Sequence, residues 1–385
     1  MINADIRRRE YGFLGDKIHF NCASVGLPPM SVQNACRDFY TKEYLDLPLG
    51  ISHGYEGQRA RTREKLARLI NSSAENIAFV HSTAEGISHL AVGLELKKGD
   101  NVVTVDLENP SGMLPWLNAR DMKGFDLRIL TTKGGVFTPD ELFSLCDENT
   151  KVLFISAVQY GTGFYADLEK IGEFCREKGI IFAVDAIQAM GRLKIDVKKY
   201  HIGYLACGGF KGLTAAFGTG FVHAEQAVLD KMTMPYAGAV SSEDYPFAPE
   251  VFSPDHKFIR FTDARKLENG SHNTFGIRMM EASCDLLLEL GTDDIERHVL
   301  SLENTVRSHV ERLGLDGVHL DEAHRSGIVV LYFDKAKYGA VKAAFDKKKI
   351  ICSLREGYAR ISLSWYNTKE EIDALCQALE AMKTL

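Results

Sequence analysis

Lys211 is an unusual lysine, because it lies within a run of glycines, alanines and aromatic residues, GGFKGLTAAFGTGF (208–221). Lysine is rarely fully buried unless another group pairs or reacts with it. A desolvated lysine amine is more often neutral, and a neutral amine attacks carbonyl carbons. The segment lacks the spacing of a nucleotide-binding P-loop, GxxxxGKS or GxxxxGKT. Two hypotheses remain: a nucleophile toward carbonyl compounds, or a lysine that reaches the surface from a glycine-rich turn.

Two further polar groups follow apolar runs that are typical of buried strands. Asp185 follows IIFAV (180–184), where a carboxylate is costly unless it meets a cation, a strong donor or the start of a helix. Ser82, Thr83 and Ala84 come just after IAFV (77–80) and open a helical pattern. The free amides of such a helix start suit an anion such as phosphate, although Ser and Thr are also common N-caps.

The elements that carry these groups predict one α/β sheet. Short β-rich runs alternate with helical patterns such as ADLEKIGEFCREKG, in which Gly179 ends the helix. The β-rich runs lie at 77–80, 101–105, 151–155, 180–184, 204–207 and 219–223. This rhythm predicts a mostly parallel sheet covered by helices, with ligands outside the carboxyl ends of its strands. A phosphate site, a buried carboxylate and a lysine, in that order, are the parts needed to hold pyridoxal 5'-phosphate (PLP).

The chain after about residue 290 has a different pattern. Apolar runs at 327–333, 350–353 and 360–365 surround a helical pattern at 337–347. A last helix is expected over 368–382, where Thr368 and Glu371 have the spacing of a capping box. We expect a small α+β unit that packs on the larger sheet without a long linker.

The segment VDAIQAMGRLKIDVKKYHIGYLACGGFKGL (184–213) resembles the signature around the Schiff-base lysine of a known family. This family is the class V aminotransferase-like branch of fold-type I PLP enzymes, which includes cysteine desulfurases, selenocysteine lyases and isopenicillin N epimerase-like proteins. The resemblance extends from FNCASVGLPP to YNTKEEIDAL. It implies a large PLP-binding domain (21–285) with a mostly parallel seven-stranded sheet, a smaller α+β C-terminal domain (286–385), and an N-terminal segment (1–20) packed on the small domain.

The resemblance also implies roles around the cofactor. Lys211 would form the Schiff base, Asp185 would pair with the pyridine nitrogen, and Gln188 would contact the phenolic oxygen. The phosphate would lie on Ser82, Thr83 and Ala84. The segment ENGSHNT (268–274) resembles one that crosses a homodimer, so that Ser271 would touch the phosphate bound to the partner subunit.

Substrate binding is implied for the C-terminal segment REGYARISLSWYNT. Arg360 stands where the family binds the substrate α-carboxylate, a role that suits an arginine because its fork grips both oxygens. Arg355 lies nearby in the sequence, and either assists Arg360 or forms a salt bridge at a domain edge.

Several positions depart from the desulfurase pattern. Phe210 replaces the histidine that precedes the lysine, and Pro110 replaces the histidine that stacks on the ring. Either Gln159 or Tyr160 would contact the phenolic oxygen. Desulfurases carry a persulfide-forming cysteine on a loop between the two tail arginines, whereas here only 356–359 separate them and Cys352 lies before that turn. A persulfide-carrying sulfurtransferase is therefore not expected.

Composition sets limits on partners and compartment. The 385 residues have a net charge of -6 without a basic stripe, so we expect no nucleic-acid partner. The eight cysteines are scattered without zinc spacing, and no apolar run approaches about 18 residues. We therefore expect a cytoplasmic protein with reduced thiols, no metal site and no membrane partner.

The expected function is that of a PLP-dependent enzyme that acts on an α-amino acid through an external aldimine and a quinonoid. The expected reactions are transamination, or C–S bond β-elimination without a persulfide cysteine. Epimerisation and a catalytically silent binding protein are the alternatives. The loops 46–57 and 237–254 are expected to recognise the substrate side chain.

Overall fold

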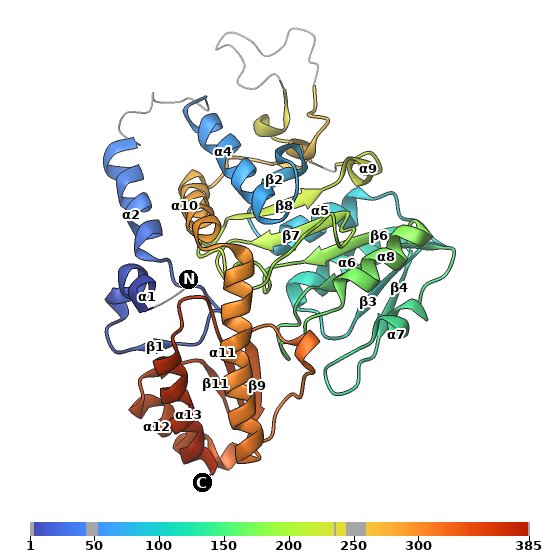
Figure 1. Ribbon diagram of the computed structural model, residues 1–385. Helices are drawn as coiled ribbons and strands as arrows, with labels where there is room; N and C mark the ends of the chain where they lie inside the picture. Colours follow the sequence, from blue (N-terminus) through green and yellow to red (C-terminus); the bar gives the residue numbers. More distant parts are fainter. Residues whose placement is uncertain (1–3, 44–52, 235, 244–258, 384–385) are drawn as a thin grey trace.

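The computed structural model describes residues 4–43, 53–234, 236–243 and 259–383 (Figure 1). The two loops expected to recognise the substrate side chain, 46–57 and 237–254, lie largely outside the described residues. No helix in the described ranges combines the length and the apolar character needed to cross a bilayer.

A central sheet forms the core of the larger part of the molecule. Within the described residues it has seven strands in the order β2-β8-β7-β6-β5-β3-β4. Neighbouring strands are parallel, except that β8 is antiparallel to β2 and β7. The strands are β2 Ile77–Val80, β3 Asn101–Val105, β4 Asp126–Leu130, β5 Thr150–Ser156, β6 Ile181–Asp185, β7 Tyr204–Gly208 and β8 Gly220–Ala224.

The mostly parallel α/β sheet expected from the sequence is confirmed. The ends of each expected β-rich run differ by at most one residue from the ends of a strand in the structure. One strand, the edge strand β4, was not expected from the sequence. Its side chains are mostly exposed or half-buried, and it carries Asp126 and Arg128, so it lacks the apolar run that marks the inner strands.

Two apolar cores lie on opposite faces of the sheet, because neighbouring residues of a strand point to opposite sides. Val102 belongs to the core that includes residues of α5 and α6, whereas Val103 belongs to the core that includes residues of α8 and α10. Burial on both faces explains the continuous apolar runs of the inner strands. The helices are α5 Thr83–Gly93, α6 Pro110–Lys123, α8 Leu168–Lys178 and α10 Thr274–Leu290.

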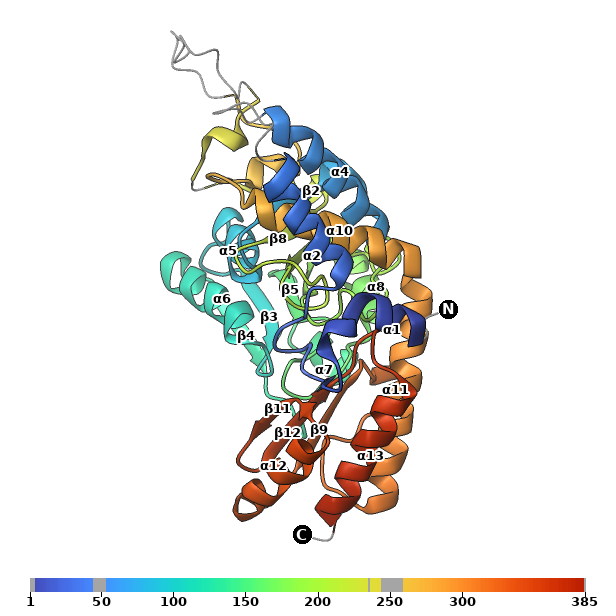
Figure 2. The same ribbon diagram turned by 90° about the vertical axis from the view of Figure 1, so that its left-hand side faces the viewer.

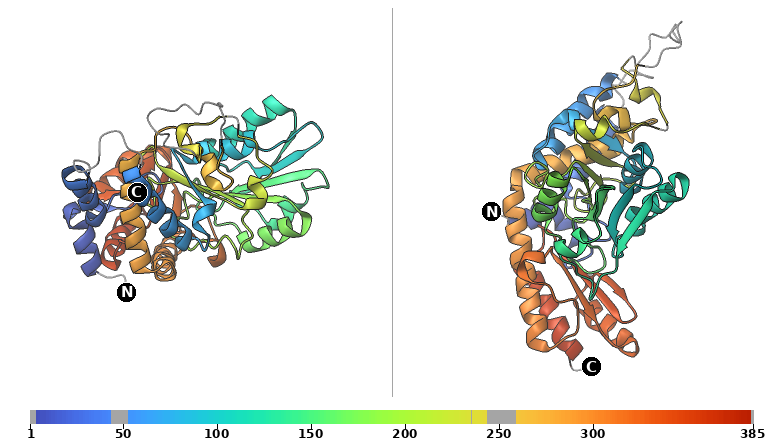
Figure 3. Two further views of the ribbon diagram at one scale, coloured as in Figure 1. Left: turned by 90° about the horizontal axis from the view of Figure 1, so that it is seen from above. Right: turned by 90° about the vertical axis from the view of Figure 1, so that its right-hand side faces the viewer.

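The C-terminal part forms a smaller α+β unit. Three antiparallel strands of its described residues have the order β11-β12-β9, namely Ser353–Arg355, Tyr358–Ser362 and Ile328–Tyr332. Three helices pack with them: α11 Thr292–Leu313, α12 Tyr338–Lys347 and α13 Lys369–Lys383. The right-hand view of Figure 3 shows this orange and red unit below the green and cyan sheet. The capping box is confirmed, since the Glu371 amide donates to Thr368 Oγ1 and the Thr368 amide donates to Glu371 Oε2, both at 3.3 Å.

The N-terminal residues lie against the small unit. β1 Ile18–His19 pairs in parallel with β10 Ile350–Ile351, and the Tyr11 ring packs 4.1 Å from that of Tyr366. Figure 2 shows α1 (Ala4–Tyr11) where the large and small units meet. The chain passes from α10 to α11 at Gly291, a few residues beyond the boundary expected at 285/286.

Candidate active site

Lys211 and Asp185 come from neighbouring strands. Asp185 is the last residue of β6 and pairs with Ala206 of β7, which ends three residues before Lys211. The loop after β7 is tightly packed: a Cβ at Gly212 would lie 1.8 Å from the Met190 carbonyl oxygen. Glycine at this position therefore lets the backbone of the lysine loop pass against the chain after β6.

Burial changes the protonation of both groups. Burial lowers the pKa of Lys211, Asp185 opposes this shift, the positive charges of Arg192 and Arg360 add to it, and the result is a pKa of about 8. Burial raises the pKa of Asp185 to about 6, although the Ile187 amide stabilises its charge by donating to Oδ1 at 2.9 Å. The pKa of the Lys211 amine is therefore closer to neutral pH, so that a larger fraction of the amine is in the neutral, nucleophilic form.

The start of α5 carries the predicted phosphate residues. Ser82 is the N-cap of α5, and its hydroxyl accepts a hydrogen bond from the Glu85 amide, which confirms the plain cap. Thr83 Oγ1 accepts from the Gly208 amide at 2.8 Å, so the helix start is tied to the end of β7. The amides of Thr83 and Ala84 have no acceptor within the helix, because they lie in its first turn. Binding of phosphate there stays a prediction.

Gln188 lies within a chain of buried polar contacts. Its Nε2 donates to the Ala23 carbonyl at 3.0 Å, and its Oε1 accepts from Arg192 Nη2 at 2.8 Å. Arg192 is only 1% exposed and has no ion pair with any residue that the structure describes. Arg192 was not among the predicted site residues, although its position four residues after Gln188 is a usable signal.

Arg360 joins three parts of the chain. Nη1 donates to the Tyr160 carbonyl and Nη2 donates to Ser24 Oγ, both at 2.8 Å. Nε is buried and has no hydrogen-bond partner in the described part of the chain. Arg355 is exposed on β11 and forms no salt bridge with a described residue, so the ion pair considered for it is not seen. Burial lowers the pKa of Arg360, and the positive charge of the nearby Arg355 adds to this shift.

Gln159 and Glu108 form a second buried polar pair beside Asp185. Gln159 follows β5, is fully buried, and donates from Nε2 to Glu108 Oε1 at 2.8 Å. Burial raises the pKa of Glu108 to about 7. The sequence analysis did not single out Glu108, although it follows the apolar run 101–105 and the rule used for Asp185 would have found it.

The residues that replace the two desulfurase histidines are apolar. The Phe210 ring stacks on the Phe217 ring at 4.4 Å, and Lys211 Nζ lies 5.7 Å from the centre of the Phe210 ring. Pro110 is the first residue of α6, directly after its N-cap Asn109. These side chains hold no proton that could be passed to a substrate.

Ser271 lies on the surface of the single chain. It is exposed, and the structure shows the neighbouring Asn273 Nδ2 donating to the carbonyls of Phe217 and Gly218 at 3.3 and 3.5 Å. Its loop is thereby attached to the end of the lysine loop. A contact of Ser271 with a partner subunit stays a prediction.

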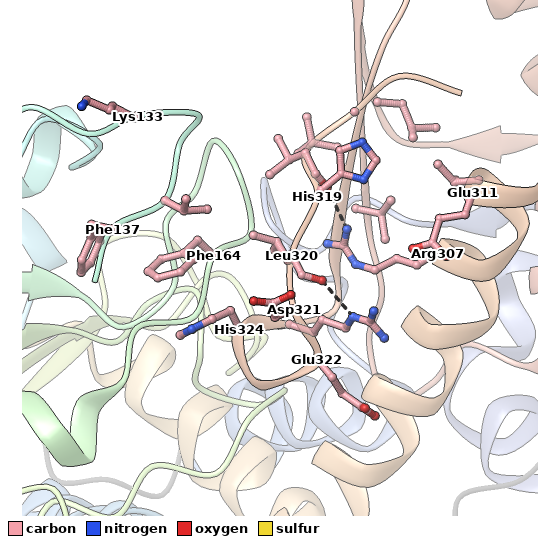
Figure 4. Close-up of a pocket in the computed structure, with 18 of the residues that line it drawn as sticks. Lys133, Phe137, Phe164, Arg307, Glu311, His319, Leu320, Asp321, Glu322 and His324 are labelled. Atoms are coloured by element: carbon pink, nitrogen blue, oxygen red, sulfur yellow. Dashed lines mark hydrogen bonds between the residues drawn. The ribbon is translucent and has the colours of Figure 1, made fainter. Parts of the chain in front are cut away.

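A cavity of about 620 Å³ lies away from these residues, between the loop at 133–138 and the segment at 317–325 (Figure 4). Phe137, Phe164, His319 and Asp321 are among the side chains around it, and none of the residues discussed above lines it. His324 at its edge forms a 2.8 Å hydrogen bond with the Tyr165 carbonyl. The cavity therefore lies between the large and the small unit and is not part of the lysine site.

The model of the family described as Aminotransferase class-V matches residues 20–375. A protein named probable cysteine desulfurase from Methanothermobacter thermautotrophicus is 28% identical, over 97% of this chain and 96% of its own. An uncharacterized aminotransferase from Bacillus subtilis, YcbU, is 25% identical over 80% of each chain.

Solved structures share the fold. The apo cysteine desulfurase of Thermococcus onnurineus NA1 has a TM-score of 0.87 at 22% identity, covering 100% of this chain and 98% of its own. The cystine C–S lyase C-DES, solved with its product cysteine persulfide, has a TM-score of 0.85 at 18% identity, covering 97% and 99%.

Proposed function

Because the chain belongs to the aminotransferase class-V family of PLP-dependent enzymes, we propose that it acts at Cα of an α-amino acid and eliminates a sulfur group from Cβ. The observation that carries the proposal is that Asp185 and Lys211 follow neighbouring strands, Asp185 at the end of β6 and Lys211 in the loop after β7, with the lysine pKa lowered to about 8.

The unsatisfied polar groups of this site fit PLP. Asp185 is buried, and only its Oδ1 has a hydrogen-bond donor in the part of the chain that the structure describes. The first amides of α5 are free to bind a phosphate. Asp185 would keep the pyridine nitrogen protonated, Lys211 would hold the aldehyde carbon, and Thr83 and Ala84 would bind the phosphate. When bound, PLP supplies an electron sink for the bond broken at Cα.

The protein contributes position and proton transfer. Arg360 would bind the substrate carboxylate through its guanidinium, whose buried Nε has no other acceptor among the described residues. Lys211 Nζ, once released as a neutral amine, would take the proton from Cα. The Phe210 ring, whose centre lies 5.7 Å from Lys211 Nζ, places an apolar surface beside the amine. The sulfur group would leave Cβ with the pair of bonding electrons and a proton, and with one water molecule the rest of the substrate would give pyruvate and ammonia.

Elimination without a persulfide on the enzyme is supported by the state of the cysteines. All eight lie within the described ranges and are free thiols. Burial raises the pKa of Cys352, the cysteine nearest the Arg355–Arg360 turn, to about 12, so its reactive thiolate is scarce at neutral pH. The names of the relatives, cysteine desulfurases and a cystine C–S lyase, support sulfur-containing substrates.

Transamination is the second candidate. It is supported by the uncharacterized aminotransferases among the relatives, and by Phe210, which removes the histidine that desulfurases of the family keep beside the lysine. In this reaction Lys211 would again move the proton taken from Cα, and the substituent at Cβ would stay in place. The protein is further proposed to be a cytoplasmic homodimer in which Ser271 completes the partner's phosphate site. Sedimentation of the PLP-loaded protein tests the dimer, and faster release of PLP is expected for Ser271→Ala.

A panel of amino acids tests the reaction. Cysteine, cystine, alanine and glutamate are added to the PLP-loaded protein, and pyruvate, sulfide, keto acid and the absorption spectrum are followed. Pyruvate with reduced sulfur from cystine or cysteine supports elimination. A pyridoxamine spectrum with keto acid supports transamination instead. Deuterium uptake at Cα without either product indicates epimerisation, and an unchanged spectrum with every substrate indicates a silent binding protein. Lys211→Ala is the control, for which no turnover is expected.

A further inference from the structure

Glu108 is a buried carboxyl group that links two strand ends. It follows β3 and is 6% exposed. Within the described residues it has three hydrogen-bond donors: the Ser156 amide at 2.6 Å and Gln159 Nε2 at 2.8 Å meet Oε1, and Ser156 Oγ meets Oε2 at 2.5 Å. Ser156 is the last residue of β5, so Glu108 joins the ends of two adjacent strands.

This geometry determines which end of the Gln159 amide faces Glu108. Glu108 Oε1 already accepts a hydrogen bond from the Ser156 amide, so this oxygen carries no proton and is an acceptor toward Gln159 as well. If the amide of Gln159 were turned over, two oxygens would meet at 2.8 Å without a hydrogen between them. Nε2 therefore faces Glu108, and Oε1 of Gln159 faces elsewhere.

Gln159 is next to residues of the candidate active site. Gln159 comes three residues after Ser156, which pairs with Asp185, and directly before Tyr160, whose carbonyl accepts from Arg360. Its Oε1 is buried and has no hydrogen-bond partner in the described part of the chain. A buried acceptor of this kind is costly unless a donor reaches it.

We propose that Glu108 is a positioning residue that holds Gln159 with Oε1 toward the site, where it accepts a hydrogen bond from a protonated hydroxyl or amine of the bound cofactor or substrate. The inference rests on the proposed function, because it needs PLP in the site. It means that Gln159 presents its side-chain oxygen, an acceptor, to the cofactor or substrate, and not its side-chain nitrogen, a donor.

The positioning does not depend on the charge of Glu108. In the neutral acid, the proton on Oε2 can be donated to Ser156 Oγ, while Oε1 still accepts from both amides. Glu108→Gln keeps the same oxygen, and its new amide can donate to Ser156 Oγ. This variant is therefore a matched control that removes the charge and retains the orientation. Glu108→Ala removes both.

The experiment uses the absorption spectrum of the PLP-loaded protein as a function of pH. An acceptor stabilises the protonated form of its donor, so removing it lowers the pH midpoint at which the visible band changes. Gln159→Ala is expected to lower this midpoint by about one pH unit, the equivalent of one hydrogen bond to a titrating group. Glu108→Ala is expected to lower it as well, and Glu108→Gln is expected to match the wild type.

A double variant separates positioning from general loosening of the fold. If Glu108 acts through Gln159, the variant with both alanines has the same midpoint as Gln159→Ala alone. An upward shift in Gln159→Ala, or a Glu108→Gln shift as large as that of Glu108→Ala, would overturn the inference. If Glu108→Ala does not fold, the direction of the shift in Gln159→Ala and the match of Glu108→Gln still decide. A wild type that shows no cofactor band would overturn the proposed function itself, and the inference with it.

Discussion

Ser24 Oγ accepts a hydrogen bond of 2.8 Å from Arg360 Nη2, although the two residues are 336 positions apart in the sequence. The same N-terminal segment reaches the lysine loop, since the Gly26 amide donates to the Phe210 carbonyl at 2.9 Å. It also reaches Gln188 through the Ala23 carbonyl. The start of the chain therefore closes a site whose chemistry comes from the large unit and whose substrate arginine comes from the small one.

Gly26→Ala is expected to disturb this closure. A Cβ at position 26 would lie 1.8 Å from the Lys211 carbonyl oxygen, and a contact with backbone cannot be relieved by rotating a side chain. We expect a loss of about 1–3 kcal/mol in the free energy of unfolding and weaker binding of PLP. Urea unfolding and PLP titration measure the two effects.

The control for this change is Gly339→Ala in α12, where a new Cβ meets nothing within 4 Å. It is expected to leave PLP binding unchanged and to stabilise the helix by up to about 1 kcal/mol. Equal PLP affinities for the two variants would show that PLP binding does not depend on the close approach of Gly26 to the Lys211 backbone.

Lys211→Met is expected to stabilise the cofactor-free protein below pH 8. The pKa of Lys211 is lowered to about 8 from 10.5, so the unfolded chain binds more protons between these values and the stability of the wild type rises with pH there. The variant should exceed the wild type by up to about 3 kcal/mol at pH 7, and the difference should vanish near pH 10.5.

Unfolding in urea at a series of pH values measures this difference. Lys178→Met on the exposed side of α8 is the control, and its difference from the wild type should not change with pH. A Lys211→Met difference that stays constant from pH 7 to 10 would contradict the lowered pKa.

Arg360→Gln is expected to reduce kcat/KM by about 10- to 100-fold, because a charge-assisted hydrogen bond to the substrate carboxylate is lost. Arg360→Lys should recover only part of this loss, since an ammonium lacks the planar fork. Steady-state kinetics on the substrate found in the panel measure both variants.

Arg355→Ala provides the comparison for Arg360. Its side chain is exposed and has no salt bridge among the residues that the structure describes, so we expect less than a threefold change. A loss equal to that of Arg360→Gln would mean that both arginines bind the substrate.

Cys352→Ala is expected to keep sulfide and pyruvate production within about twofold of the wild type. The raised pKa of this thiol, about 12, leaves little thiolate to attack a sulfur atom at neutral pH. Sulfide release from cysteine, measured beside mass spectrometry of the protein after turnover, checks this. A persulfide found on Cys352, or loss of sulfide release in the variant, would instead indicate desulfurase chemistry.

The sequence predicts the inner strands well, because a strand buried on both faces appears as a continuous apolar run. It does not predict β4, whose Asp126 and Arg128 interrupt the run and are tolerated because β4 is an edge strand. The order of the strands and the antiparallel direction of β8 depend on contacts between distant residues, which local patterns do not contain.

The candidate site was predicted in the same uneven way. Lys211 and Asp185 were found because a charged group after an apolar run is conspicuous. Glu108 was missed although it also follows an apolar run, and Arg192 although it is four residues from Gln188. Ser24 gives no such signal, because it matters only through Arg360, which is 336 residues away. The orientation of Gln159 is likewise set by Glu108, and no property of residue 159 alone reveals it.

The pairing of β1 with β10 has a consequence for synthesis on the ribosome. The Ala23 amide donates to Ser362 Oγ, and the parallel bridge between Asn21 and Ser362 continues this contact, so a segment that is made early has to wait for one that is made much later. The large sheet can form while the chain is still growing. The site around Lys211 cannot be completed until residue 362 has left the exit tunnel, so nascent chains stalled before that point should bind the cofactor only weakly.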